Sequence, residues 1–332
     1  MESTLRTSRS VGLCTLVALA VILGALPLVA QVQQARRLYR IGVLNEAWAA
    51  NHPTVEGLKA GLRELGFEEG RDVTFDIRFT EGKPEATASA AAALAQASVD
   101  LIFTSNEAAT LAAKAATQRI PVVFTLVGDP VATGIVKELA RPDTNLTGVS
   151  SLTTELVPKR LEALKTLIPT LKRVFAFYHG ADLPSSAAIV RALEAAPRVG
   201  LEVVPRTVTT PEQLDEMLRQ LRPGDALLAP DIATMDIPAV LLEVSLASRI
   251  PAVFSSELWV SHGGLVSYGA DYRAQGVQAA RLVAKILRGT RPQDLPVEGA
   301  DKIDLAVNLK TARLLGVPVP RKVLLRADVL RR

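Results

Sequence analysis

Cysteine is almost absent from the 332-residue sequence, and histidine is scarce. The single cysteine, Cys14, lies in an N-terminal segment that we expect to be removed, and the three histidines are His52, His179 and His262. The rest of the chain therefore has no material for a disulfide framework, a thiol nucleophile or a cysteine-based metal site. Few acid–base enzymes are built with so little histidine, although carboxylate chemistry stays open. We expect neither a metal nor a cofactor.

The sequence also lacks the patterns of several enzyme and nucleic-acid-binding classes. It contains no G-x-S-x-G, H-E-x-x-H, G-x-G-x-x-G or P-loop pattern. His179, Asp182 and Ser185 would supply a Ser-His-Asp set, but such residues cluster by chance in loops. The net charge is +4 and the basic residues are spread along the chain, which argues against a nucleic-acid partner. We therefore expect a protein without enzymatic activity.

The first thirty residues differ in character from everything that follows them. Arg6 and Arg9 form a short positive region, an apolar stretch runs from Val11 to Leu23, and the small residue Ala30 offers a cleavage point. This order is typical of a bacterial secretory signal. The apolar stretch is shorter than the roughly 20 residues of a membrane-spanning helix unless the residues after it are added, so an uncleaved anchor is the alternative. We predict a signal peptide over residues 1–30, cleaved near Ala30, and a periplasmic protein.

From Leu38 onward the apolar residues follow alternating strand and helix periods. Val73–Phe79 alternates apolar and polar side chains, whereas Thr54–Leu65 carries apolar residues at helical spacing and is followed by Gly66. The expected strands are 39–44, 73–79, 99–103, 120–126, 146–149, 173–178, 201–204, 226–229, 251–254, 263–269 and 302–307, and the expected helices are 54–65, 84–97, 107–117, 158–167, 185–195, 211–221, 238–248, 272–288 and 309–315. This rhythm is typical of parallel sheets covered by helices.

The rhythm is interrupted by a polar stretch at residues 141–155 that is rich in turn-forming residues, and it then resumes. Two successive half-sheets of similar design predict an α/β fold with two Rossmann-like lobes, each built on a parallel sheet. A cleft is expected where the lobes face each other. A chain of this length also suits two lobes better than one.

Short motifs spread over the chain after the signal segment resemble those of one family. They are Ile41–Leu44, Gly57–Gly66, Ile120–Phe124, Gly128–Gly134, Ala140–Pro142, Asn145–Val149, Lys159–Glu162, Gly263–Gly269, Lys285–Gly289 and Asn308–Ala312. In their order and spacing, the sequence resembles the bacterial substrate-binding proteins of ABC transporters that are sometimes associated with tryptophan or tyrosine uptake. The resemblance implies a type I periplasmic binding protein fold, in which a three-strand hinge joins the two lobes.

The same resemblance implies where the chain crosses between the lobes. The crossings are expected near residues 149–151, 262–264 and 295–298. Lobe one then comprises residues 38–149 plus 265–294, and lobe two comprises residues 151–262 plus 297–330. Three crossings form a hinge that lets the lobes close on a ligand.

Ligands of open parallel sheets bind beyond the carboxyl ends of the strands, and this rule selects candidate ligand-binding residues in both lobes. Tyr268 is added because it lies on a crossing strand and is able to face the cleft. The candidates are Asn45, Trp48, Thr104, Ser105, Asn106, Thr125, Asp129, Tyr178, Asp182, Ser185, Asp231, Thr234, Glu257 and Tyr268.

The polar candidates each have a functional and a structural interpretation. Ser105 and the N–H groups of the helix after it suit a carboxylate, but Ser105 or Asn106 also serves as a plain helix cap. Asp129 suits an ammonium group, or it forms a turn with its own backbone. Asp231 and Glu257 are the corresponding carboxylates in lobe two.

The aromatic candidates stand out because aromatic residues make up only 4% of the chain. Trp48, Tyr178 and Tyr268 would form a wall that stacks on an aromatic or heterocyclic solute. Ordinary packing is the alternative, and it is the preferred interpretation for Tyr178. Trp259 is expected in the core of lobe two.

The resemblance implies the periplasmic solute-binding component of an ABC importer. Such a protein captures a small polar or zwitterionic ligand, with an aromatic or branched amino acid as the leading expectation. It hands the ligand to an ABC permease in the inner membrane. We expect a monomer with no nucleic-acid partner. A sensory protein that presents its ligand to a membrane receptor is the alternative.

Overall fold

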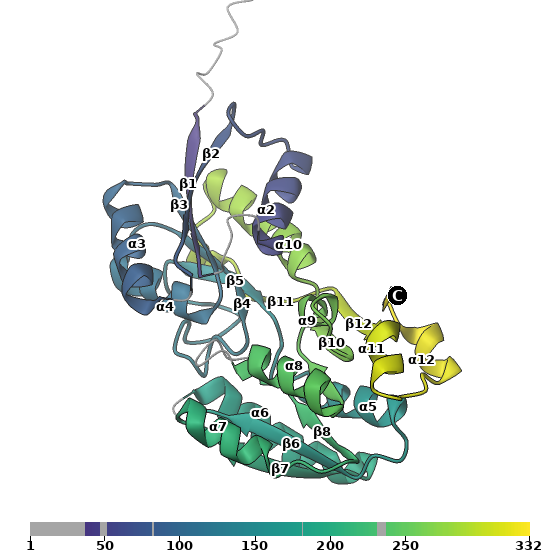
Figure 1. Cartoon of the computed structure of the whole chain (residues 1–332). Coiled ribbons are helices and arrows are strands. Elements are labelled where there is room, and N and C mark those ends of the chain that lie inside the picture. Colours follow the sequence, from purple (N-terminus) through teal and green to yellow (C-terminus); the bar gives the residue numbers. More distant parts are fainter. Residues whose placement is uncertain (1–36, 47–51, 82, 181, 231–236) are drawn as a thin grey trace, which may run out of the picture. The chain divides into compact units, whose positions relative to one another are not determined.

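Two β-sheets, each covered by helices on both faces, make up the described chain (Figure 1). The computed structural model describes residues 37–46, 52–81, 83–180, 182–230 and 237–332. Among these residues no helix combines the length and the hydropathy that crossing a membrane requires.

The first sheet has the strand order β11-β5-β4-β3-β1-β2, and all its pairs are parallel. Its strands are β1 (Tyr39–Asn45), β2 (Val73–Phe79), β3 (Leu101–Ser105), β4 (Val122–Val127), β5 (Leu146–Ser150) and β11 (Glu298–Gly299). The helices α2 (Pro53–Glu64) and α10 (Tyr272–Leu287) pack on one face, and α3 (Pro84–Gln96) and α4 (Glu107–Ala116) on the other. Successive strand residues face opposite sides, so Val43 joins the first of these apolar clusters and Leu44 the second.

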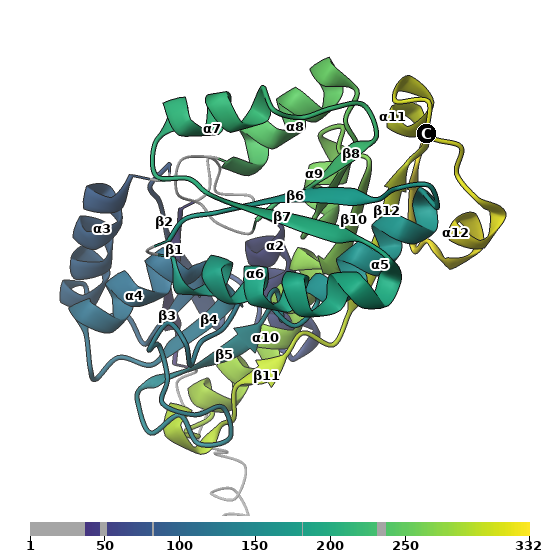
Figure 2. The same ribbon diagram turned by 90° about the horizontal axis from the view of Figure 1, so that it is seen from below.

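The second sheet has the strand order β13-β12-β10-β9-β8-β6-β7, with one antiparallel pair, β10 and β12. Its strands are β6 (Arg173–Tyr178), β7 (Glu202–Thr207), β8 (Asp225–Leu228), β9 (Ala252–Phe254), β10 (Val266–Ala270), β12 (Ile303–Asn308) and β13 (Val329–Arg331). Helices α5 (Val157–Leu167) and α6 (Leu183–Ala195) cover one face, and α7 (Pro211–Leu218) and α8 (Ile237–Ser248) the other (Figure 2). Shorter elements complete this part: η2 (Ala196–Val199), α9 (Glu257–Ser261), α11 (Leu309–Leu314) and α12 (Arg321–Arg326), whereas η4 (Pro292–Asp294) follows α10 and lies beside β5 of the first sheet.

The chain passes between the two sheets three times, as expected, but two of the crossings are displaced. The first crossing, residues 151–156, leads from β5 to α5. The second follows Ala270 rather than residues 262–264, because β10 pairs with β9 and β12. The third follows Gly299, because β11 pairs with β5 before β12 returns to the second sheet. The lobe boundaries expected at residues 265 and 297 therefore lie near residues 271 and 300.

Gly264, at the position expected for the second crossing, serves packing inside the second sheet instead. A Cβ atom on Gly264 would lie 2.9 Å from the carbonyl oxygen of Trp259 and 3.0 Å from the ring of Phe254. Glycine permits this close approach because it has no Cβ. The strand that follows, β10, pairs with β9 in the same sheet and ends at Ala270.

Helix α10 lies against α2 at a distance that leaves no room for side chains between them. A Cβ atom on Gly276 would lie 2.0 Å from the carbonyl oxygen of Thr54, and one on Gly57 would lie 2.0 Å from that of Arg273. Such separations are far inside van der Waals contact. Glycine at these positions therefore lets the two backbones touch, which fixes α10 on the first sheet although its preceding strand belongs to the second.

We predict that Gly276→Ala lowers the free energy of unfolding by about 2 kcal/mol, because the new methyl group overpacks the contact with α2. Alanine by itself stabilises a helix interior by about 1 kcal/mol relative to glycine. A net loss of stability in the variant is therefore due to the steric clash and not to helix propensity. The measurement is urea denaturation. Gly180→Ala is the control, since a Cβ there meets only the Thr207 methyl group at 3.6 Å. An unchanged free energy for Gly276→Ala would contradict the close contact.

Candidate ligand-binding site

A cavity of about 340 Å³ lies beside the first crossing segment, at the carboxyl ends of strands of both sheets. We call it the cleft cavity. It is lined by Asn106, Glu107, Ala108, Leu111, Leu126, Gly128, Ser151, Thr153, Thr154, Asp182, Ser185, Ala188, Pro238, Leu258, Trp259 and Tyr272. Its volume falls within the range of small-molecule sites.

The local sequence explains how each loop reaches the cavity. Asn106 follows β3, Gly128 follows β4, Ser151 follows β5, and Asp182 precedes α6 in the loop after β6. Parallel strands bring their carboxyl ends to one edge of a sheet, so loops far apart in the sequence meet there. Residues after β9 complete the lining from α9.

Two aromatic side chains form the apolar wall of the cleft cavity. Trp259 on α9 stacks on the core residue Phe254, with ring centroids 5.9 Å apart. Tyr272, the first residue of α10, stacks on His52 at 5.9 Å. Each ring is thus held by a second ring behind it. A rigid aromatic wall of this kind suits a flat apolar group.

The rim of the cavity contains strained backbone. Asn106 has a φ of 102° and Leu126 a φ of 57°, values that are uncommon outside glycine and that cluster at ligand sites. Asn106 caps α4, because its Oδ1 accepts from the N–H of Ala109, and its Nδ2 donates to the buried carboxylate of Glu46 at 2.7 Å. These two bonds hold the strained residue in place.

Three of the predicted ligand-binding residues line the cleft cavity: Asn106, Asp182 and Ser185. Asp182 caps α6, since its Oδ1 accepts from the backbone N–H of Ser185 at 2.6 Å. The hydroxyl of Ser185 lies within hydrogen-bond distance of the carbonyl oxygens of Asp182 and His179. Both the capping and the pocket-lining interpretations therefore hold together at these positions.

A second group of predicted residues is buried and bonds within the sheet instead. Ser105 donates to Asn45 Oδ1 at 2.8 Å, the hydroxyls of Thr104 and Thr110 lie 2.8 Å apart, and Thr125 donates to the carbonyl oxygen of Thr104 at 3.2 Å. None of them belongs to the lining of the cleft cavity. They hold together the ends of β1, β3 and β4, because each of these strand ends places its polar side chains against a neighbouring strand or helix.

A third group of predicted residues does not belong to the lining of the cleft cavity. Asp129 forms a turn, with its Oδ1 accepting from two backbone N–H groups that follow it. Tyr178 and Tyr268 pack against the apolar core of the second sheet, and neither lines the cleft cavity. Glu257 accepts from Arg331 Nε at 2.8 Å. This ion pair ties α9 to the last strand, β13, rather than to the cavity.

Three further predicted residues, Trp48, Asp231 and Thr234, lie outside the described residues. Their part in ligand binding stays a prediction.

Sequence reasoning missed most of the lining. Ser151 and Thr154 lie in the first crossing, where the run of hydroxyl residues was read as a turn-rich break between lobes. Trp259 was assigned to the core, and it does stack on the core residue Phe254, but it also lines the cavity. Tyr272 was treated as an ordinary helix start. The available signal was the scarcity of aromatic residues, which applies to Trp259 and Tyr272 as well as to the three aromatics that we selected.

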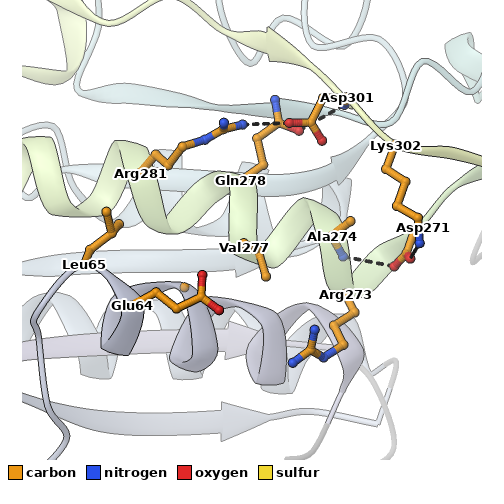
Figure 3. A pocket seen from close by; sticks show the side chains of 11 residues that line it. Glu64, Leu65, Asp271, Arg273, Ala274, Val277, Gln278, Arg281, Asp301 and Lys302 are labelled. Carbon is orange, nitrogen blue, oxygen red and sulfur yellow. Dashed lines mark hydrogen bonds and ion pairs between the residues drawn. The ribbon is translucent and has the colours of Figure 1, made fainter.

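A second, wider groove of about 520 Å³ runs along α2, α10 and the third crossing (Figure 3). Lys302 Nζ lies 2.6 Å from Asp271 Oδ2, and Arg281 donates to Asp301 Oδ2 at 2.7 Å. Burial raises the pKa of Asp271, but hydrogen bonds from Lys302 and from the Ala274 N–H outweigh it, so the pKa lies below its usual value. These paired charges join the second and third crossings, and the groove lacks the aromatic wall of the cleft cavity.

The comparison with protein families agrees with this geometry. The family model described as ABC transporter substrate binding protein matches residues 48–330. The chain belongs to this family.

Solved and curated relatives of this substrate-binding protein cover most of its length. A conserved domain protein of Vibrio cholerae is 28% identical, with a TM-score of 0.80 over 89% of this chain and 100% of its own. An ABC domain of Streptococcus pneumoniae in complex with L-Trp is 26% identical, with a TM-score of 0.78 and the same coverage. The tyrosine-binding protein of Clostridioides difficile (strain R20291) is 28% identical over 270 residues, which are 80% of this chain and 78% of that protein. The predicted type I periplasmic binding protein fold and the predicted role in solute binding are confirmed.

His52 links the site of this substrate-binding protein to pH. It caps α2, with Nδ1 accepting from the N–H of Thr54 at 3.4 Å, and it supports the ring of Tyr272. Burial lowers the pKa of His52 to about 4, from 6.5. Between these two pH values the unfolded chain binds a proton that the folded protein excludes. Stability is therefore complete above pH ~6.5 and falls as the pH is lowered toward 4.

We predict that the free energy of unfolding attributable to His52 falls by roughly 2–3 kcal/mol between about pH 7 and about pH 4.5. His52→Asn keeps a cap acceptor but does not titrate. The measurement is urea denaturation of both proteins at the two pH values. The wild type should lose more stability than the variant, and equal losses would show that His52 is not the group responsible.

Proposed function

We propose that this protein captures an aromatic amino acid in the cleft cavity and releases it, unchanged, to an ABC permease. The observation that carries the proposal is the pairing of two aromatic side chains, Trp259 and Tyr272, with polar groups such as Ser151 and Asp182 in one cavity. An aromatic amino acid has the same two parts, a flat apolar ring and a charged polar end.

Relatives support this ligand class. One is named a tyrosine-binding protein, and another was crystallised with L-Trp. Binding without turnover is supported by membership of the substrate-binding family.

The proposal includes a location and a partner. The order of charged, apolar and small residues over 1–30 supports export to the periplasm and cleavage near Ala30. Membership of the substrate-binding family supports a permease in the inner membrane as the partner of a monomeric receptor. The cavity takes residues from both sheets, and a ligand that contacts both would favour closure about the three crossings.

We predict that L-tryptophan or L-tyrosine raises the melting temperature of the purified protein, whereas sugars and nucleobases do not. A ligand at about 100 times its dissociation constant adds roughly 2.7 kcal/mol to the stability of the folded state. Chromatography after incubation should recover the amino acid unaltered. A panel without any aromatic amino acid among its hits would refute the ligand class, and consumption of the ligand would refute the receptor role.

Replacing the aromatic wall should weaken this binding. We expect Trp259→Leu and Tyr272→Leu each to raise the dissociation constant about tenfold, because the stacking surface is lost while apolar volume is kept. Phe79→Ala is the control, since Phe79 is 46% exposed at the end of β2 and does not line the cleft cavity. Isothermal titration calorimetry gives all three values. Unchanged affinities in both leucine variants would show that the aromatic ring of the ligand does not stack on Trp259 or Tyr272.

A further inference from the structure

The side-chain amide of Gln275 has a defined orientation beside the cleft cavity. Gln275 lies on α10 and is 1% exposed. Its Oε1 accepts from the hydroxyl of Ser151 at 3.1 Å and from the backbone N–H of Leu126 at 3.4 Å. A backbone N–H only donates, so the amide atom that faces Leu126 must be the oxygen. Both partners of Gln275 belong to the lining of the cavity.

This orientation determines the hydrogen-bonding character of Ser151. Its hydroxyl has one proton, and that proton is directed to Gln275. Its backbone N–H is also used, since it donates to the carbonyl oxygen of Val127 at 2.9 Å. Toward the cavity Ser151 therefore offers only oxygen lone pairs. A hydroxyl in this state recognises a donor, such as an ammonium group.

Thr154 offers the complementary group three residues later. It lines the same cavity and is 5% exposed, and its hydroxyl has no hydrogen-bond partner among the described residues. A buried polar group without a partner is costly. Rotation about the Cα–Cβ bond lets the hydroxyl donate to an acceptor in the cavity, and a carboxylate oxygen is the strongest acceptor that a small solute carries.

The crossing segment that carries both hydroxyls is firmly held. Arg160, which is 2% exposed, donates from Nη1 to the carbonyl oxygen of Thr153 and from Nε to that of Tyr268, both at 2.9 Å. The N–H of Leu156 closes a turn onto Leu152 at 3.0 Å. Among the described lining residues none is lysine or arginine, so a carboxylate in this cavity has to be bound by neutral donors.

We propose that Ser151 and Thr154 recognise the two charged groups of an α-amino acid. Ser151 accepts from the ammonium group and Thr154 donates to the carboxylate. Gln275 is a positioning residue: its Oε1 accepts the hydroxyl proton of Ser151, so that the serine oxygen faces the ligand as an acceptor. The inference rests on the proposed function, and it deepens it by assigning the ammonium and carboxylate groups of the amino acid to two different side chains.

Three ligands that differ only in their charged groups test this assignment: L-tryptophan, tryptamine without the carboxylate, and indole-3-propionate without the ammonium group. Thr154→Val should weaken L-tryptophan and indole-3-propionate about tenfold or more, and leave tryptamine unchanged. Ser151→Ala should weaken L-tryptophan and tryptamine and leave indole-3-propionate unchanged. Gln275→Met, which removes the acceptor for the serine proton, should follow the Ser151→Ala pattern. The matching tyrosine set serves as a repeat.

Thr154→Ser is the matched control, because it keeps the hydroxyl and should bind L-tryptophan within about twofold of the wild type. Melting temperatures without ligand show whether each variant is folded. If the two analogues bind the wild type too weakly to measure, the affinities of Thr154→Val and Thr154→Ser for L-tryptophan decide the role of Thr154. Affinity for L-tryptophan that is equal in Thr154→Val and wild type, or a loss that is the same for every ligand, overturns the inference. A wild type that binds no aromatic amino acid refutes the proposed function instead.

Discussion

The backbone contact between α2 and α10 is the constraint on which the rest of the structure depends. The strand before α10, β10, belongs to the second sheet. Helix α10 itself packs on the first sheet, so the chain passes from one sheet to the other between these two elements. Gly57 and Gly276 let the two helices touch without intervening side chains. Because the two backbones are in direct contact, α10 has little freedom to shift along or away from α2. Tyr272 and Gln275, at the beginning of the helix, are thereby held beside the cleft cavity.

Polar groups in the crossings connect this constraint to function. Lys302 pairs with Asp271 across the second and third crossings, and the buried Arg160 holds the first crossing against β10. Buried polar side chains are normally satisfied. The unpartnered Thr154 hydroxyl is an exception that lines the cavity. A receptor gains specificity from such a group, because a ligand that supplies the missing acceptor removes a cost present in the free protein.

The strand-end rule located the edge of each sheet where the cleft cavity lies, but at several positions the side chains that it selected do not line this cavity. Thr104 and Thr125 are true strand-end residues, yet the side chain of Thr104 bonds to Thr110 on α4 and that of Thr125 bonds to the backbone of β3. Successive residues of a strand face opposite sides, and which side meets a cavity depends on the twist of the sheet and on the next loop. Asn106 and Asp182 do line the cavity, because a helix cap must lie at the strand-to-helix turn, and this turn is at the same edge of the sheet.

The amino-acid sequence alone determined the order of the longer strands and helices, the two-sheet α/β fold and the family. Apolar periodicity and turn residues act over a few positions, and their effects survive any later arrangement of the elements. Tertiary structure alone decided that β10 joins the second sheet, that Glu298 and Gly299 form a strand, and that Ser151, Thr154, Trp259 and Tyr272 share one cavity. These outcomes depend on pairing and packing between segments that are separate in the sequence, and β5 and β11 are more than a hundred residues apart. No local pattern records which distant backbone or side chain a given residue will meet.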